Sequence, residues 1–198
     1  MNYYLQKREA AVQKERKQYL HNLLYEKIER LPEDFVSSGE LLGVDLSIPR
    51  RCLCISFVEK QEMNVGGIST LLEKLEKILP KIQGYSELCL AYREKNQLIL
   101  FLPVEKDVDV GKFIQSMREK YRLPVEVTMK VGTDDRLSTG LELRQGKQKA
   151  EKSLKEAMAK PEKDIIYYSA MTYGIFVSEI SDSAKWEYLS RIFQGMDT

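Results

Sequence analysis

Two short apolar segments, residues 88–92 and 98–102, flank the polar stretch REKNQ. This arrangement predicts a β-hairpin, and Pro103 ends its second strand because proline cannot donate a hydrogen bond to a neighbouring strand. Further strand-like segments lie before and after the hairpin, each separated from it by an amphipathic, helix-like segment. A hairpin that lies between strands connected by helices implies a sheet with both parallel and antiparallel strands. Few folds have such a sheet.

The other segments set the order of the elements. Residues 51–58 form an apolar run with no strongly polar face, which predicts a central strand covered on both sides. A turn-rich linker at 39–49 precedes this strand, and after it we expect a helix at 68–82, the hairpin, a helix at 108–121, a strand at 125–131, a helix at 143–159 and a strand at 164–168. The predicted fold class is α+β, with a mixed, ferredoxin-like sheet and helices packed on it.

A long helix is predicted at residues 2–30, which contain neither glycine nor proline. Leu5, Val12 and Tyr19 recur every seven residues, and a denser apolar stripe follows. Two interpretations stay open: a partly exposed helix that docks on its own domain by residues 19–31, or a signalling helix that pairs with its copy in a dimer. We therefore divide the chain into this helix (1–31), a domain that contains the sheet (32–168) and a C-terminal helical tail (169–198).

Composition excludes several classes of protein. The 31 Lys and Arg residues nearly balance the 30 Asp and Glu residues, so the chain is not expected to coat nucleic acid or an anionic membrane with its whole surface. No apolar run is long enough to cross a bilayer, and we expect a cytoplasmic protein with no membrane contact. Residues 144–163 are basic but contain no aromatic side chain, and their aliphatic residues are expected to pack in the core. This favours a solvated helix face over a nucleic-acid site.

Cysteine and histidine limit the metal and nucleophile chemistry. Cys52, Cys54 and Cys89 are odd in number and lie in apolar stretches, as reduced thiols in a core do. A Cys-x-Cys pair without a second pair is a weak zinc signal, and His21, the one histidine, lies on a charged helix. We expect no metal, no cofactor and no histidine-dependent catalytic triad.

Three segments together resemble the GGDEF-like central region of bacterial transcription regulators of the carbohydrate (sugar) diacid and purine-catabolism type. The segments are YLHNLLYEK followed by LLGVDLSIPRRCLCI, then AYREKNQLILFLP, and finally VTMKVGTDDRLSTGLELRQGKQKAEKSLKEAM. The resemblance covers residues 16–168 and implies a nucleotide-cyclase-like domain between an N-terminal sensing domain and a C-terminal helix-turn-helix. Neither of these partners is evident in the sequence, so DNA would be bound only through a region missing from this chain.

The same resemblance places the Gly-Gly-Asp-Glu-Phe motif of diguanylate cyclases on Glu94, Lys95, Asn96, Gln97 and Leu98. Long charged side chains replace the two glycines, which let the backbone approach a nucleotide in the cyclases. Neutral amides replace the two acidic residues and cannot balance divalent cations as carboxylates do. We therefore expect no catalytic residues and no enzyme activity.

A ligand-binding module is the first alternative. Gly66 and Gly67 precede a predicted helix, where glycines can expose backbone N–H groups to an anion, and Arg93 could add a positive charge. The simpler interpretation of the two glycines is a plain turn. The alternative predicts a residual anion or nucleotide pocket at these three residues.

A phosphotransfer enzyme is the second alternative, and it would need relocated carboxylates to hold its metal. Glu59, Asp134 and Asp135 are the candidates for that role. Our leading hypothesis is instead a catalytically inert regulatory domain of a transcription regulator. It would relay a signal through its terminal helices and form a homodimer through the N-terminal helix.

Overall fold

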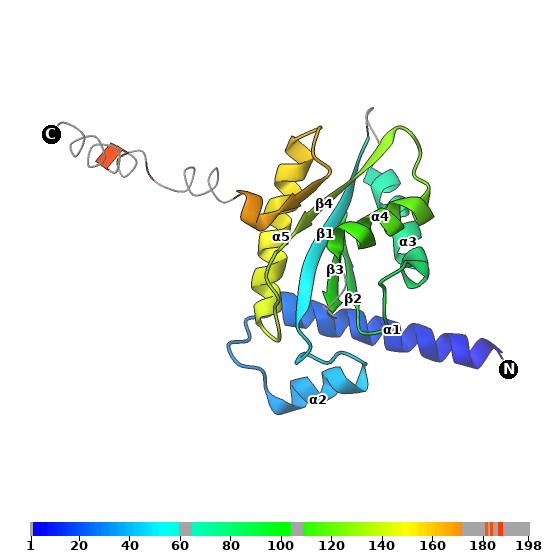
Figure 1. The fold of residues 1–198 in the computed structure, drawn as a ribbon. Helices are drawn as coiled ribbons and strands as arrows, with labels where there is room; N and C mark the ends of the chain where they lie inside the picture. The colour runs from blue at the N-terminus through cyan, green and yellow to red at the C-terminus, as the bar shows by residue number, and fades with distance from the viewer. Residues whose placement is uncertain are drawn as a thin grey trace.

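The computed structural model describes residues 2–59, 65–103 and 109–171, together with 181, 183, 186 and 187. It has an α+β fold in which helices cover both faces of a five-stranded mixed sheet (Figure 1). The elements are α1 (Asn2–Tyr25), α2 (Glu33–Leu41), β1 (Arg50–Glu59), α3 (Val65–Ile78), η1 (Leu79–Lys81), β2 (Leu90–Glu94), β3 (Gln97–Pro103), α4 (Val110–Tyr121), β4 (Val127–Thr133), α5 (Glu142–Ala159), β5 (Ile165–Tyr167) and η2 (Tyr168–Met171). The predicted fold class is confirmed, while most of the expected C-terminal helical tail lies outside the described residues.

The strands run in the order β2-β3-β1-β4-β5, with β1 at the centre. β1 is antiparallel to both β3 and β4, β2 is antiparallel to β3, and β4 is parallel to β5. The hairpin prediction is confirmed, because Glu94 pairs with Gln97 across the β2–β3 turn. The prediction of a buried central strand is confirmed as well.

Alternation along β1 separates two hydrophobic cores. Leu53, Ile55 and Phe57 pack with α3 and α4 on one face of the sheet. Cys52 and Cys54 point to the other face, where they pack with α1 and α5. Cys52, Cys54 and Cys89 are all buried with free thiols. Each face of the sheet therefore has its own pair of covering helices.

Gly132 on β4 lets α5 lie directly against the sheet. A Cβ atom at this position would overlap the backbone nitrogen of Leu154 and the backbone oxygen of Ala150, and would lie 2.7 Å from the Leu154 Cα. Only a residue without a side chain permits such an approach of helix to strand. The glycine of the VGT segment thus sets the distance between α5 and β4.

The N-terminal region differs from the prediction in two ways. α1 ends at Tyr25 rather than at residue 30, because Arg144 of α5 donates hydrogen bonds to the Leu23 oxygen (2.5 Å) and the Ile28 oxygen (3.1 Å). The helix docks on the domain through Tyr19, Leu20, Leu23 and Leu24, which are all buried. In addition, the linker expected from residue 39 begins later, because the unpredicted helix α2 extends to Leu41.

Lys130 on β4 fixes the path of the chain after α5. Its side chain is buried, and its ammonium donates to the carbonyl oxygens of Lys160 (3.0 Å), Pro161 (3.0 Å) and Lys163 (2.8 Å). The same ammonium lies 3.3 Å from a carboxylate oxygen of Asp164. This one side chain holds the connection between α5 and β5 against the sheet.

Among the described residues, we find no helix with the length and apolar character that crossing a membrane requires.

Candidate functional site

The turn between β2 and β3 carries the residues at the cyclase-motif positions. Glu94 ends β2 and Gln97 begins β3, so Lys95 and Asn96 form the exposed turn between them. Lys95 has a φ of 33°, a left-handed conformation that suits glycine better than lysine. Ser56 of β1 donates to the Asn96 carbonyl at 2.5 Å and fixes the turn against the sheet. The backbone thus keeps a glycine-like conformation although the glycine itself is absent.

Five polar side chains from α1, the hairpin and α5 meet beside this turn, and we call them the Lys147 network. Lys147 lies 2.6 Å from the Glu151 carboxylate and 3.8 Å from that of Glu94, and its own side chain is buried. The amide of Gln97 donates to Glu151 (2.6 Å) and to Glu94 (3.4 Å). The hydroxyl of Tyr25 donates to Glu94, and the Lys147 ammonium lies 4.6 Å from the centre of the Tyr25 ring.

Both carboxylates of the Lys147 network have partners within the protein. Burial by itself would raise the pKa of Glu94, but the Tyr25 hydroxyl, Lys147 and Gln97 lower it below its ordinary value. Burial and the bond to Glu94 raise the pKa of Tyr25, which therefore stays protonated as a donor. The two carboxylates share one ammonium and one amide donor. The ammonium offsets one of the two negative charges, and the neutral donors Gln97 and Tyr25 stabilise the remaining one by hydrogen bonds.

The last turn of α1 is held at several points around this network. His21 Nδ1 and the Tyr92 hydroxyl of β2 lie 2.8 Å apart, within hydrogen-bond distance. The Tyr25 and Tyr92 rings are 6.3 Å apart, and Arg144 binds the carbonyl groups at the end of the helix. The turn that carries chemistry in cyclases therefore lies against the end of the N-terminal helix.

A hollow of about 300 Å³ lies between the hairpin and the C-terminal half of α5. Its walls are Ser56, the turn residues from Glu94 to Gln97, Leu154 and Met158. Among the described residues, we find no group of three histidine, cysteine, aspartate or glutamate side chains arranged to hold a metal ion. The wall combines amide, hydroxyl and apolar groups with one lysine, and its carboxylate, Glu94, already belongs to the Lys147 network.

The residues predicted for an anion pocket lie on the opposite face of the sheet. Gly66 and Gly67 are in the first turn of α3. Arg93 donates to the carbonyl oxygen of Ser69 in the same helix (3.4 Å) and lies 3.4 Å from the Glu76 carboxylate. Its guanidinium thus joins β2 to α3. The residue that it contacts, Ser69, follows Gly67 by two positions in that helix. Ligand binding at this place stays a prediction.

The residues predicted for a relocated metal site lie at opposite ends of β4 along the backbone. Glu59 pairs with Val127 at the start of β4, whereas Asp134 and Asp135 follow the end of that strand. A strand of this length separates them by roughly 20 Å.

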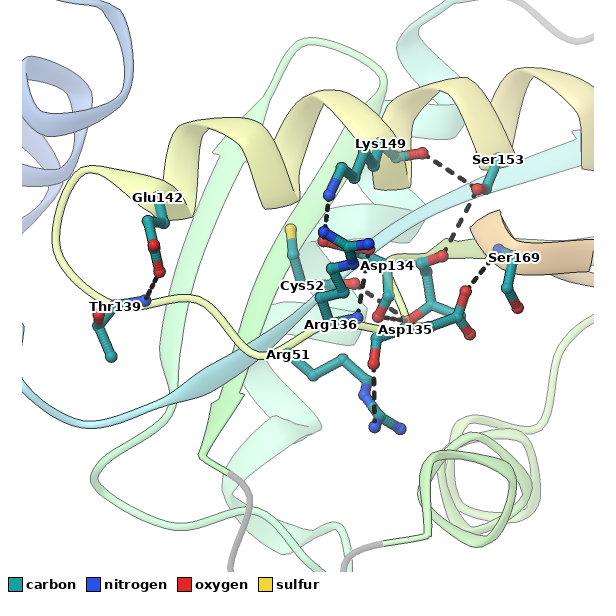
Figure 2. Close-up of polar contacts among 11 residues, drawn as sticks. Arg51, Cys52, Asp134, Asp135, Arg136, Thr139, Glu142, Lys149, Ser153 and Ser169 are labelled. Carbon is teal, nitrogen blue, oxygen red and sulfur yellow. Dashed lines mark hydrogen bonds and ion pairs between the residues drawn. The ribbon is translucent and has the colours of Figure 1, made fainter. Parts of the chain in front are cut away.

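Asp134 and Asp135 have structural partners of their own at that end of β4, as Figure 2 shows. Asp134 is buried and accepts a hydrogen bond from the Arg136 backbone (3.3 Å), with Lys149 3.8 Å away. Asp135 accepts a hydrogen bond from the Ser169 backbone (2.5 Å). The two aspartates hold the loop after β4 and the segment after β5 in place.

Sequence reasoning missed the Lys147 network. Residues 144–163 were expected to form a solvated face, but Lys147 is buried and Arg144 binds the end of α1. The physical reason is that the Glu94 and Glu151 carboxylates need a cation where α5 meets the hairpin. The spacing of Lys147 and Glu151, four residues apart on a helix, was the available signal, and it indicates a local ion pair but not its third partner.

The chain belongs to the family whose model is described as a GGDEF-like domain, which matches residues 29–157. None of the curated proteins matches this chain. Among solved structures, an EAL/GGDEF domain protein from M. capsulatus is 13% identical with a TM-score of 0.44, and the match covers 61% of this chain and 85% of that chain. The regulator of polyketide synthase expression from Bifidobacterium adolescentis is also 13% identical, with a TM-score of 0.43, and the match covers 75% of this chain and 56% of that chain. The family assignment rests on the matched residues alone.

Proposed function

We propose that this GGDEF-like domain is a non-catalytic, cytoplasmic regulatory module of a sugar-diacid-type transcription regulator. The observation that carries the proposal is the Lys147 network. Glu94 and Gln97, at cyclase-motif positions, bind Tyr25 of α1 and Glu151 of α5. The motif turn thus connects the N-terminal helix to the domain, as expected of a module that relays a conformational signal.

The absence of catalysis is part of this proposal. Phosphoryl transfer needs carboxylates that are free to hold divalent cations, and Glu94 and Glu151 are already bound by Lys147 and by neutral donors of the protein. We expect no turnover when the protein is incubated with a nucleoside triphosphate and magnesium or manganese, followed by chromatography of the nucleotides. Turnover that Glu59→Ala abolishes would instead establish the phosphotransfer alternative.

Self-association is the second part of the proposal. Tyr19 is buried against Phe35 of its own domain, with the ring centres 4.4 Å apart, so a dimer seam would use the more N-terminal part of α1. Val12, which is 39% exposed, is a large apolar residue in that part of the helix. We expect a homodimer in light scattering that Val12→Glu converts to monomer, while Val125→Glu at an exposed loop valine does not. A monomeric parent protein would contradict this part.

DNA enters the proposal only through a region outside this chain. The net formal charge is +1, and the basic side chains Arg144 and Lys147 of α5 are engaged in contacts with α1 and the hairpin. We expect no salt-dependent binding of this chain to duplex DNA in fluorescence anisotropy, because such binding requires several free phosphate contacts. Binding that weakens steeply with salt would show that the chain itself reads or holds DNA.

A further inference from the structure

A cavity of about 250 Å³ lies between α1, the α3–η1 segment and the outer edge of the sheet. It is separate from the motif turn and from the hollow beside α5. Its polar wall contains Arg16 and Lys17 of α1, Glu76 of α3, and Tyr85 before β2. Buried Cys89 and the half-buried Ala91 of β2 complete the sheet side of the cavity.

Positive charge predominates around this cavity. Glu76 is the one carboxylate in the described wall, and it is shared by Lys17 (2.9 Å) and Arg93 (3.4 Å). Arg16 has no carboxylate partner among the described residues, and it donates a hydrogen bond to the Cys89 carbonyl (3.2 Å). The wall therefore holds more cationic than anionic groups, which favours binding of an anion.

Arg50 is a second cationic group close to Arg16, although it does not line the cavity itself. Its guanidinium is fully buried and donates to the carbonyl oxygen of Leu88 (3.0 Å), adjacent to the Cys89 carbonyl that Arg16 binds. Its Nη2 atom is buried and has no hydrogen-bond partner among the described residues. Burial lowers the pKa of Arg50, Asp45 partly offsets this, and the charge of Arg16 lowers it further. An anion in the cavity would relieve this repulsion.

We propose that the cavity is a binding site for a small oxyanion carrying carboxylate or phosphate groups, held by Arg16 and Lys17. Its volume is below the roughly 300–1,000 Å³ typical of sites for drug-sized ligands, so a dinucleotide does not fit the proposal. Both ligands lie in neighbouring positions of α1, on the side of that helix that faces the edge of the sheet. The inference does not depend on the proposed absence of catalysis.

The test measures binding of inorganic phosphate and of malonate by calorimetry and by thermal unfolding of the whole chain, with sodium chloride at matched ionic strength as the reference. We expect saturable binding of one probe or both, and a higher unfolding midpoint than in chloride. Binding of phosphate alone would show that the site prefers phosphate groups, and binding of malonate alone would show that it prefers carboxylates. Either result supports the site. No saturable binding of either probe would overturn the proposal.

Variants locate the site. Arg16→Gln is expected to weaken binding about tenfold or more, because it removes a charge-assisted hydrogen bond. Lys17→Gln provides a second test that leaves the Cys89 contact intact, and Lys14→Gln, at an exposed position of α1 outside the cavity wall, is the matched control. Circular dichroism without anion checks that each variant folds. Equal affinity in all three variants would place the anion elsewhere and overturn the proposal.

Discussion

The two faces of the sheet are built differently. The face covered by α3 and α4 is closed by aliphatic and aromatic side chains such as Leu72 and Phe113, which are fully buried. The face covered by α1 and α5 has an apolar core too, but the end of α1 is held by charged and polar groups of the Lys147 network. Apolar packing stabilises the whole domain, whereas a polar junction can be released locally. Under the proposed function, the polar contacts at the end of α1 are where a signal would act, while the apolar face maintains the fold.

The largest expected effect concerns the contact between α5 and β4. Gly132→Ala places a methyl group where the backbone of Ala150 and Leu154 lies, so the helix must move away from the sheet. We expect a loss of at least about 3 kcal/mol in the free energy of unfolding, measured by urea denaturation. Gly43→Ala, at an open position with a φ of 69°, is the control for the general cost of replacing a glycine. Equal losses in both variants would mean that α5 does not require the close approach.

The next prediction tests whether the contact between the end of α1 and the Lys147 network can open while the rest of the domain stays folded. Lys147→Met leaves the Glu94 and Glu151 carboxylates without their shared cation, at an expected cost of about 2 kcal/mol because both are partly exposed. Hydrogen exchange should accelerate most in the last turns of α1. Lys155→Met, at an exposed lysine of the same helix, should change neither quantity.

Leu72→Ala serves as the comparison from the other face, with an expected cost of about 2–5 kcal/mol. Its removal from the α3 core should accelerate exchange throughout the sheet rather than in α1 alone. If Lys147→Met produced the same uniform pattern, the two faces would form one cooperative unit and the proposed distinction would be wrong.

Two tyrosines, one on each face, give a matched pair. Tyr19 has a buried hydroxyl with no hydrogen-bond partner among the described residues, while the Tyr121 hydroxyl donates to the Leu71 carbonyl (2.6 Å). Tyr19→Phe should therefore stabilise the protein by up to about 1 kcal/mol, and Tyr121→Phe should destabilise it by about 1 kcal/mol. Changes of the same sign in chemical denaturation would contradict this contrast.

The same pair predicts a dependence on alkaline pH. Burial raises the pKa of Tyr19 and of Tyr121 to about 12, with the Glu40 charge contributing at Tyr19. Each folded-state pKa exceeds the unfolded value of about 10. The contribution of each protonated tyrosine to the free energy of unfolding is therefore fully present below pH 10 and is lost as the pH rises toward 12. Unfolding free energies measured across this window should fall less steeply in each phenylalanine variant than in the parent protein.

The smallest expected effect is at the motif turn. Lys95→Gly relieves the left-handed strain of the lysine but increases the conformational freedom of the unfolded chain. We therefore expect the free energy of unfolding to change by no more than about 1 kcal/mol. Asn96→Gly, at the neighbouring turn position, should be destabilising because no positive φ is relieved there. A larger loss in Lys95→Gly than in Asn96→Gly, measured by urea denaturation, would mean that the turn conformation is not strained.

Several elements could be predicted from the sequence because their signals are local. The alternation of 51–58 and the polar turn after residue 92 identify β1 and the hairpin within one or two residues. The helix α2 has weak local signals, since its EDFVSSGEL sequence contains two serines and a glycine, and Phe35 stacks on Tyr19 of α1. That contact joins segments that the sequence pattern does not link.

The candidate site shows the same limit. The loss of glycines and acids at the motif positions could be read directly, and it led to the prediction of an inert domain. The partners of Glu94 could not be read, because Tyr25 and Lys147 come from distant helices. A side-chain network of this kind depends on the packing of α1 and α5, which no periodicity specifies.

The ammonium of Lys130 also has a mechanical consequence. It ties three carbonyl oxygens between α5 and β5 to β4, and β5 itself pairs with β4. A pull on the chain after β5 would load β4 and then β1 in shear before it could peel α5 away. The connection between α5 and β5 is therefore held rigidly on β4, and a force applied after β5 reaches the sheet before it reaches α5.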